Sequence, residues 1–317
     1  MTLLEVRNLV VRYPGSTAPA VAGISFQLPE RGSLALVGES GSGKSSTVLA
    51  MTRLLEPAVE VTAEAVSFAG EDLLSASARR LRELRRGKLA MVFQDPAATW
   101  NPTRTLAAQL LDGLRGDERR RRRAQLVEHM RRVGIVDPDH RLDDYPHRLS
   151  GGMLQRALLA GGLAHKPSLL IADEPTSALD TTVQAELLAL IDQLRAEEGL
   201  TLLLISHDLG VVSRMAAQTV VLYAGRVVER GSTATLLRRP QHPYTRDLLA
   251  AIPRLSGSRK VPLRIGRLAE PSRFGCPYAG RCAFAIDVCR TEAPALRWVG
   301  DAEVACHRAP LAESEAA

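Results

Sequence analysis

Gly38-Glu39-Ser40-Gly41-Ser42-Gly43-Lys44-Ser45 fits the pattern G-x-x-x-x-G-K-[ST], and this stretch decides the fold. Ser33 to Val37, directly before it, is an apolar run that predicts a buried strand, and Ser45 to Leu55 predicts a helix. In a strand–loop–helix of this kind, backbone N–H groups and the positive end of the helix dipole surround phosphate oxygens. The stretch therefore predicts a nucleotide-phosphate site, in which Lys44 reaches the β and γ phosphates and Ser45 offers its hydroxyl to Mg²⁺.

A second motif follows further along the chain. Leu169 to Ala172 is an apolar run that ends in Asp173 and Glu174. At the carboxyl end of a parallel strand, both carboxylates would face the nucleotide crevice. Asp173 suits the Mg²⁺ shell and Glu174 suits the polarisation of an attacking water. A strand that ends in Asp-Glu is a common cap by itself, so this interpretation depends on the phosphate motif upstream.

Short apolar runs alternate with helical patterns along most of the chain. The predicted strands besides those above are Leu3 to Val11, Leu89 to Phe93, Leu202 to Ile205 and Val220 to Tyr223. This alternation predicts an α/β fold with a mainly parallel sheet and helices on both faces. Thr105 to Ala164 has a helical pattern, which predicts an inserted helical subdomain at about residues 95–164. A Ser-Gly-Ser linker near Ser256 predicts a boundary between domain 1–255 and an extension, 256–317.

The bulk composition is that of an ordinary globular chain. Hydrophobic residues make up 45% of 317 residues, and no run approaches the roughly 18–20 apolar residues that span a bilayer. Met1 to Val11 lacks the pattern of a signal peptide, so we expect a cytosolic location. The net charge of +6 comes partly from Arg119 to Arg123. No aromatic residues are interleaved with the basic ones, so we expect a solvated helix face and no nucleic-acid partner.

All four cysteines follow residue 275, with the spacing C-x5-C-x6-C-x16-C: Cys276, Cys282, Cys289 and Cys306. Disulfides are disfavoured in a reducing cytosol, and structural zinc sites use C-x2–4-C pairs, which are absent. A [4Fe–4S] cluster takes four thiolates at wider spacings. We expect this cluster, with zinc and free thiols as the alternatives. His307 is interpreted as a surface residue or a neighbour of the ligands. A metal centre would cross-link a segment too small to bury its own core.

The stretch Leu149-Ser150-Gly151-Gly152-Met153-Leu154-Gln155-Arg156 resembles the LSGGQ signature of ABC transporter ATPases, with Met153 where the family has Gln. Importers of the peptide type often have Met there. Other stretches resemble that family in the family's order, over roughly residues 3–235. They are Gln94 as the Q-loop, Ser177-Ala178-Leu179-Asp180 as the D-loop, His207 as the switch histidine and Tyr13 as the ring that stacks on adenine.

This resemblance implies a P-loop NTPase (RecA-like) core with a helical subdomain and a small antiparallel β part. It implies an ATPase with Glu174 and His207 in catalysis and Mg²⁺ held by Ser45, Gln94 and Asp173. The signature residues Ser150, Gly151, Gly152 and Gln155 would act on the ATP of a partner ATPase, and Asp180 would belong to the D-loop. The implied ATP contacts are Tyr13, Gly38, Glu39, Ser40, Gly41, Ser42, Gly43, Lys44, Ser45, Ser46 and Gln94.

Three further stretches resemble the dipeptide/oligopeptide importer subfamily. They are Gln94-Asp95-Pro96 followed by Asn101-Pro102, Pro240-Gln241-His242-Pro243-Tyr244-Thr245-Arg246 with Leu248-Leu249, and the four cysteines. The resemblance implies an ATP-hydrolysing translocase subunit on the cytoplasmic face of the membrane. Its implied partners are two permease subunits, a second, non-identical ATPase and a substrate-binding protein. The subfamily also serves nickel, glutathione and oligosaccharides. A DNA-repair ATPase of this family would have long coiled coils, and a translation-factor ATPase would have two ATPase domains in one chain. The sequence shows neither feature.

Overall fold

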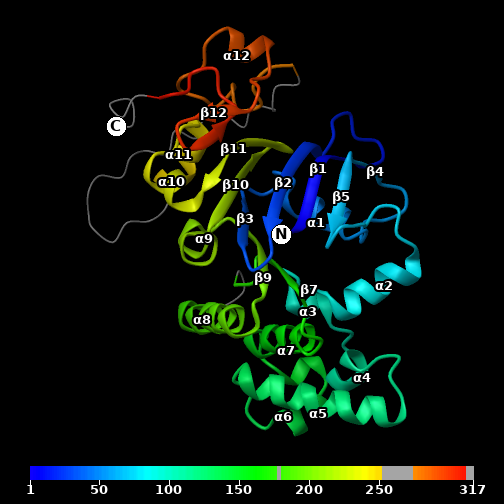
Figure 1. The fold of residues 1–317 in the computed structure, drawn as a ribbon. Coiled ribbons are helices and arrows are strands. Elements are labelled where there is room, and N and C mark those ends of the chain that lie inside the picture. Colours follow the sequence, from blue (N-terminus) through cyan, green and yellow to red (C-terminus); the bar gives the residue numbers. More distant parts are fainter. Residues whose placement is uncertain (177–179, 252–273, 312–317) are drawn as a thin grey trace. The chain divides into compact units, whose positions relative to one another are not determined.

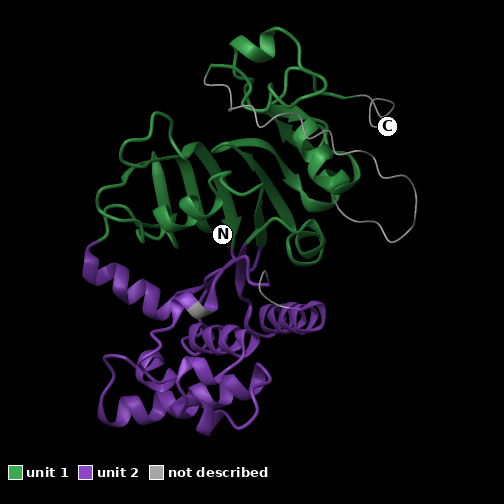
Figure 2. Cartoon of the chain, turned by 180° about the vertical axis from the view of Figure 1, so that it is seen from behind, with its two compact units in different colours: residues 1–29, 33–76, 205–317 green, residues 30–32, 77–204 purple. Residues whose placement is uncertain are grey.

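The computed structural model describes residues 1–176, 180–251 and 274–311. The chain forms two compact units, which Figure 2 distinguishes by colour. Unit 1 comprises Met1–Pro29, Ser33–Ala76 and Ile205–Ala317, and unit 2 comprises Glu30–Gly32 and Ser77–Leu204.

An antiparallel sheet lies at the N-terminal end of unit 1. Its central strand is β1 (Thr2–Arg12), in which Leu4, Val6, Leu9 and Val11 are buried. The antiparallel neighbours of β1 are β2 (Val21–Pro29), β4 (Glu60–Thr62) and β5 (Ala65–Phe68), and β6 (Glu71–Asp72) pairs with β5. The small antiparallel β part is thus present.

The second sheet of unit 1 contains the strand that leads into the phosphate motif. β3 (Ser33–Val37) is buried along its whole length, as predicted for a parallel strand, and pairs in parallel with β10 (Gln218–Tyr223). β11 (Arg226–Ser232), β13 (Ala302–Val304) and β12 (Arg297–Val299) follow in antiparallel order. The helices of unit 1 are α1 (Lys44–Met51), α9 (Leu209–Met215), α10 (Thr233–Arg238), α11 (Pro243–Ala250) and α12 (Val288–Thr291).

Unit 2 combines parallel strands with a group of helices. β7 (Leu89–Val92) pairs in parallel with β8 (Leu169–Asp173), and β9 (Thr201–Ser206) lies on the other side of β8. α5 packs on α6 and α7 in the lower part of Figure 1. The helical elements are α2 (Ala78–Gly87), α3 (Pro96–Thr99), α4 (Leu106–Leu110), α5 (Gly116–Arg132), α6 (Pro138–Asp143), η1 (Pro146–Arg148), α7 (Gly151–Leu163) and α8 (Thr181–Glu198). Those from α3 to α7 lie within the predicted range 95–164.

One predicted helix end differs from the structure. The helix after the phosphate motif ends at Met51 and not at Leu55, because Arg53 adopts a left-handed backbone conformation with φ 52° that a helix cannot continue through. The expected boundary near Ser256 lies outside the described residues. The described residues on both sides of it belong to unit 1, and β13 of the extension pairs with β11. The described part of the extension is therefore joined to this sheet of unit 1, and the predicted boundary stays a prediction. None of the described helices has both the length and the apolar character needed to cross a membrane.

Candidate nucleotide-binding site

Two glycines of the phosphate motif occupy positions that exclude a side chain. A Cβ on Gly38 would lie 2.3 Å from the backbone oxygen of Leu222, so the loop passes too close to β10 for any other residue. Gly43 is the N-cap of α1 with φ 97°, and its Cβ would lie 2.6 Å from the backbone oxygen of Ala20. The glycines of this pattern are thus required by the geometry of the loop itself.

The loop holds the Lys44 ammonium group inside its own curve. Lys44 is buried, and its Nζ donates to the carbonyl oxygens of Gly38 at 2.7 Å and Glu39 at 2.8 Å. Ser42 Oγ lies 3.4 Å from the same nitrogen. A positive charge fixed in a ring of backbone groups at the start of a helix is what the triphosphate of a nucleotide requires.

Tyr13 lies close to this loop, and its stacking on adenine stays a prediction. Its hydroxyl is 3.0 Å from Ser46 Oγ, in the first turn of α1. Ser45 and Ser46, the two residues after Lys44, are half-buried. His207 follows β9 and is exposed, and its predicted contact with the γ-phosphate stays a prediction.

The two carboxylates of the second motif lie in unit 2. Asp173 is the last residue of β8 and is buried. Glu174 follows with φ 45°, a left-handed conformation that costs about 1–3 kcal/mol in a residue other than glycine and that typically occurs at functional sites. Gln94 Nε2 donates to the Glu174 carboxylate at 2.9 Å. Gln94 and Glu174, predicted separately, therefore lie in direct contact.

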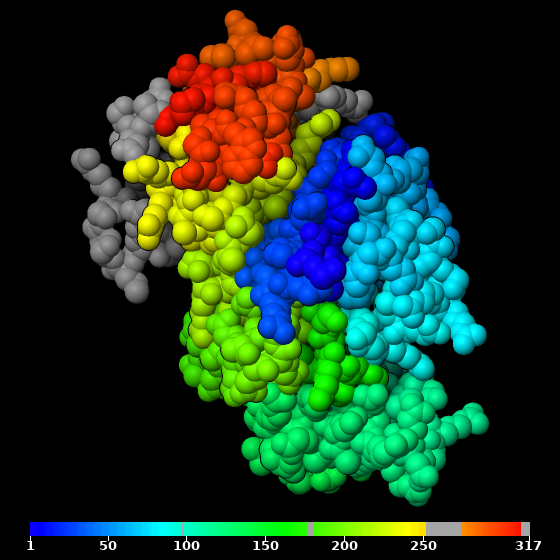
Figure 3. All heavy atoms as spheres, in the orientation of Figure 1, coloured from blue at the N-terminus to red at the C-terminus, as the bar shows by residue number. Residues whose placement is uncertain are grey.

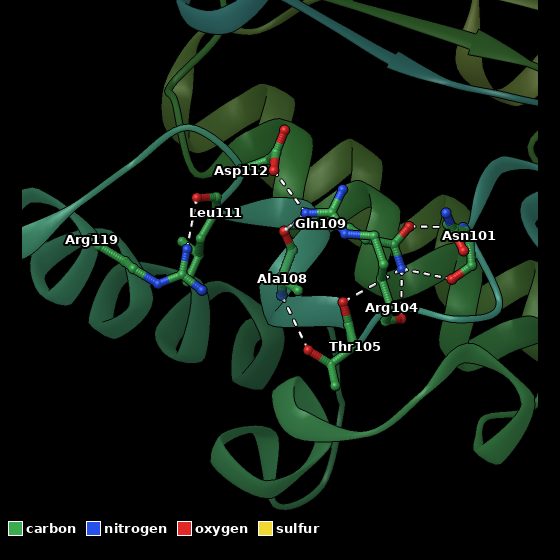
Figure 4. A network of polar contacts seen from close by, with 8 residues as sticks. All are labelled: Asn101, Arg104, Thr105, Ala108, Gln109, Leu111, Asp112 and Arg119. Carbon is green, nitrogen blue, oxygen red and sulfur yellow. Dashed lines mark hydrogen bonds and ion pairs between the residues drawn. The ribbon is translucent and has the colours of Figure 1, made fainter.

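The segment that follows Gln94 is organised around one side chain. Gln109 Nε2 donates to the carbonyl oxygens of Asn101 at 3.0 Å and Arg104 at 2.9 Å, and its Oε1 accepts from Asn101 N at 2.8 Å (Figure 4). Arg104 in turn forms an ion pair with Asp112 at 2.7 Å. The turn 101–105 is thus fixed to α4 through Gln109.

The signature residues divide into two groups. Ser150 is the N-cap of α7 and accepts from Met153 N at 3.3 Å. Gly151 is exposed and nothing lies within 4 Å of a Cβ placed on it, so a ligand can approach the N-terminus of α7 there. Gln155 differs from these two residues: it is 2% exposed and lies beside Val92 and Leu170. Gln155 lies one turn further along α7 than the N-cap, and its predicted action on a partner's nucleotide stays a prediction.

Asp180, expected in the D-loop, is the N-cap of α8. Its carboxylate accepts from the backbone N–H groups of Thr182 and Val183, both at 3.0 Å. The rest of that motif, residues 177–179, lies outside the described residues.

The segment that begins with Pro240 is anchored by a carboxylate that the sequence interpretation missed. Glu229 on β11 is fully buried and accepts from Gln241 N at 2.7 Å and His242 N at 3.1 Å. Burial raises the pKa of Glu229. His242 caps α11 through Nδ1, which accepts from Tyr244 N at 3.1 Å, and burial lowers the pKa of His242 to about 3. The signal in the sequence was a charged residue, Glu229, next to the apolar residues of a strand, where a buried charge needs partners.

The four cysteines gather in one apolar cluster with aromatic side chains of unit 1. Cys276, Cys289 and Cys306 are buried there, and Cys282 packs against them. In Figure 3 the orange and red residues 274–311 cover the yellow surface of α10 and α11. Burial raises the pKa of Cys276 to about 11 and that of Cys282 to about 12, so these thiols carry protons at neutral pH. Among the described residues, no three side chains of His, Cys, Asp or Glu are placed to hold a metal ion as they stand.

Comparisons with known proteins show the family to which the chain belongs. Residues 21–177 match the family described as ABC transporter, and residues 228–289 match the oligopeptide/dipeptide transporter C-terminal region. The chain is 44% identical over 312 residues to a putative peptide import ATP-binding protein of Brucella abortus, with 96% of this chain and 94% of that protein covered. It is 40% identical over 321 residues to the dipeptide transport ATP-binding protein DppD of Escherichia coli K12, with 97% of each covered.

A solved dimeric ATP-binding cassette, in a post-hydrolysis state with ADP and Pi, matches with a TM-score of 0.63 at 25% identity. The match covers 73% of this chain and 99% of that one, which confirms the predicted P-loop NTPase fold. The chain therefore belongs to the ATP-hydrolysing subunits of ABC transporters, in the group that carries the oligopeptide/dipeptide transporter C-terminal region.

Proposed function

We propose that this chain binds and hydrolyses ATP to power the import of peptides through an ABC transporter. The observation that carries the proposal is the phosphate loop, whose curve fixes the Lys44 ammonium group between the carbonyls of Gly38 and Glu39. The relatives named for peptide or dipeptide transport, at 40–44% identity over nearly the full chain, support the substrate class.

In the proposed reaction, Lys44 binds the β and γ phosphates and Glu174 accepts a proton from the attacking water. Gln94 orients the Glu174 carboxylate through the 2.9 Å hydrogen bond. His207 would donate a hydrogen bond to the γ-phosphate. Oxygen atoms of Ser45, Gln94 and Asp173 are ligands that suit Mg²⁺, which would neutralise charge on the phosphates.

The signature residues are proposed to act on a second ATPase chain. Ser150 and Gly151 lie at an open helix N-terminus, a geometry that favours phosphate oxygens of another chain. We propose that this second chain is non-identical, and that two permease subunits hold the pair at the cytoplasmic face of the membrane. A substrate-binding protein would complete the importer.

Nickel, glutathione and oligosaccharides remain the alternative cargoes. A strain deleted for the gene and complemented with the wild-type chain should regain uptake of a radiolabelled dipeptide, whereas complementation with Lys44→Ala should not. Unlabelled nickel, glutathione and oligosaccharide should fail to compete. Restored uptake of one of these cargoes in place of the dipeptide would overturn the peptide assignment and leave the motor role intact.

We also propose that the four cysteines hold a [4Fe–4S] cluster of structural role, with zinc as the alternative. The support is the gathering of four sulfur donors in one apolar cluster. Binding would release the thiol protons. Anaerobic purification should give about four irons and four sulfides per chain. One zinc and no iron would overturn the assignment.

A further inference from the structure

Arg281, in the cysteine-bearing extension, contacts the phosphate loop directly. Its two terminal nitrogens pair with both carboxylate oxygens of Glu39, at 2.7 Å and 2.9 Å. Glu39 is the second residue of the phosphate motif, and both residues belong to unit 1. A two-point pair of this kind fixes orientation as well as charge.

Three tyrosines hold the Arg281 guanidinium in place. Its central carbon lies 5.8 Å from the ring centre of Tyr223 and 5.5 Å from that of Tyr278, within cation–π distance. Tyr244 packs against both rings, with centroid distances of 4.7 Å and 5.3 Å. The side chain of Arg281 is 23% exposed, so most of its surface is covered by the protein. Its pKa is raised, first by the hydrogen bonds to Glu39.

Glu39 is held at a second point by α11. Tyr244, fully buried in α11, accepts a hydrogen bond from Glu39 N at 2.8 Å. The carbonyl of the same residue accepts from Lys44 Nζ at 2.8 Å. The backbone of Glu39 thus lies between Tyr244 on one side and the phosphate-binding lysine on the other.

We propose that Arg281 and Tyr244 are positioning residues for ATP binding, because together they fix Glu39 and so the carbonyl groups that hold Lys44. The proposal rests on the proposed role of residues 38–45 in binding ATP. Arg281 has a second effect, because it neutralises a carboxylate that lies in the phosphate loop. Without Arg281 that carboxylate repels the triphosphate. The residue after Arg281 is Cys282, so the cysteine cluster and the nucleotide site are linked through adjacent residues.

The test measures MgATP binding to the purified full chain. Arg281→Ala should raise the Kd about 10-fold, which corresponds to about 1.4 kcal/mol. Glu39→Gln in the Arg281→Ala background should bring the Kd back to within about 3-fold of wild type, because the repulsive charge is gone. Tyr244→Phe, which removes only the hydroxyl, should raise the Kd about 3-fold through the lost hydrogen bond. Arg290→Ala, an exposed arginine of α12, is the matched control and should leave the Kd unchanged.

A purely structural role of Arg281 predicts other results. If Arg281→Ala binds within about 2-fold of wild type, or if Glu39→Gln restores nothing, the positioning role is wrong. In the assembled transporter, Arg281→Ala should raise KM for ATP and leave kcat nearly unchanged, and Arg281→Lys, which keeps the charge, should recover part of the loss. An equal fall in kcat would also refute it. Normal binding by Lys44→Ala would instead refute the proposed function of the loop.

A measurement on the wild-type chain also tests the proposal, and it avoids any variant that could fail to fold. If Arg281 and Tyr244 favour the ATP-bound loop, then ATP must stabilise their contacts by the same free energy. Saturating MgATP should slow hydrogen exchange of the wild-type amides in residues 278–285. An unchanged exchange rate in that segment, with ATP bound, would contradict the proposal.

Discussion

Substitution of Glu174 by glutamine separates ATP binding from ATP hydrolysis. Glutamine keeps the size of the side chain and can still accept the hydrogen bond from Gln94 Nε2, now 2.9 Å from the carboxylate. The left-handed φ of 45° at position 174 strains glutamate and glutamine equally, so the variant adds no backbone strain. Loss of a charged acceptor should change stability by about 1 kcal/mol.

The same change removes the group that accepts the proton of water. Loss of a general base lowers turnover by about 10²–10⁴-fold, or about 2.7–5.4 kcal/mol in the barrier. Hydrolysis should be measured in the assembled transporter with the equivalent glutamate of the second ATPase also substituted, so that only the site of this chain turns over. MgATP binding, measured in parallel, should stay within about 2-fold of wild type.

Two controls make this test sharp. Glu174→Asp keeps a carboxylate but shortens the side chain, so it should retain more activity than the glutamine variant. Gln94→Ala keeps the base and removes the hydrogen bond that orients it, which should cost about 10-fold in turnover. A Glu174→Gln complex that hydrolyses ATP at the wild-type rate would refute the role given to this residue.

Three further predictions concern the phosphate loop, α11 and the signature. Gly43→Ala places a Cβ 2.6 Å from Ala20 O at φ 97°, so thermal denaturation should show a loss of about 1–3 kcal/mol and ATP binding should fall; unchanged stability would contradict this. Because the folded pKa of His242 is about 3 against 6.5 in the unfolded chain, unfolding takes up a proton between these values, and stability should fall as pH drops from 6.5 towards 3. His242→Asn, which keeps a capping side chain, should weaken that pH dependence in denaturant titrations. Ser150→Ala should slow hydrolysis at the partner's site and leave ATP binding by the isolated chain unchanged, which binding and turnover assays can separate.

The parts of the fold that the sequence predicts best are those next to rigid motifs. β3 has the predicted bounds, Ser33–Val37, because a fully buried parallel strand must be apolar throughout and the glycine-rich loop fixes its end. Glycine and lysine spacing likewise predicts the phosphate loop, since only glycine fits at positions 38 and 43. Both features depend on residues that are neighbours in the sequence, so they can be predicted from one sequence alone.

Contacts between distant segments could not be predicted in the same way. Arg281 and Glu39 are 242 positions apart, and nothing in either local pattern indicates the pair. Gln155 belongs to the signature stretch, yet the turn of α7 directs it inward, which only the packing against β7 and β8 decides. The sharp change in cysteine content predicts an extension, but the pairing of its strand β13 with β11 of unit 1 could not be predicted from the sequence.

The rate of ATP hydrolysis with and without the other transporter subunits tests the central claim most directly. The purified chain alone should hydrolyse MgATP slowly, because Ser150 and Gly151 are proposed to complete a site on another chain. The complete complex should be fast, and its substrate-binding protein should stimulate it further when loaded with a peptide. Full transporter activity from the isolated chain, or a complex whose rate ignores the peptide, would contradict the account.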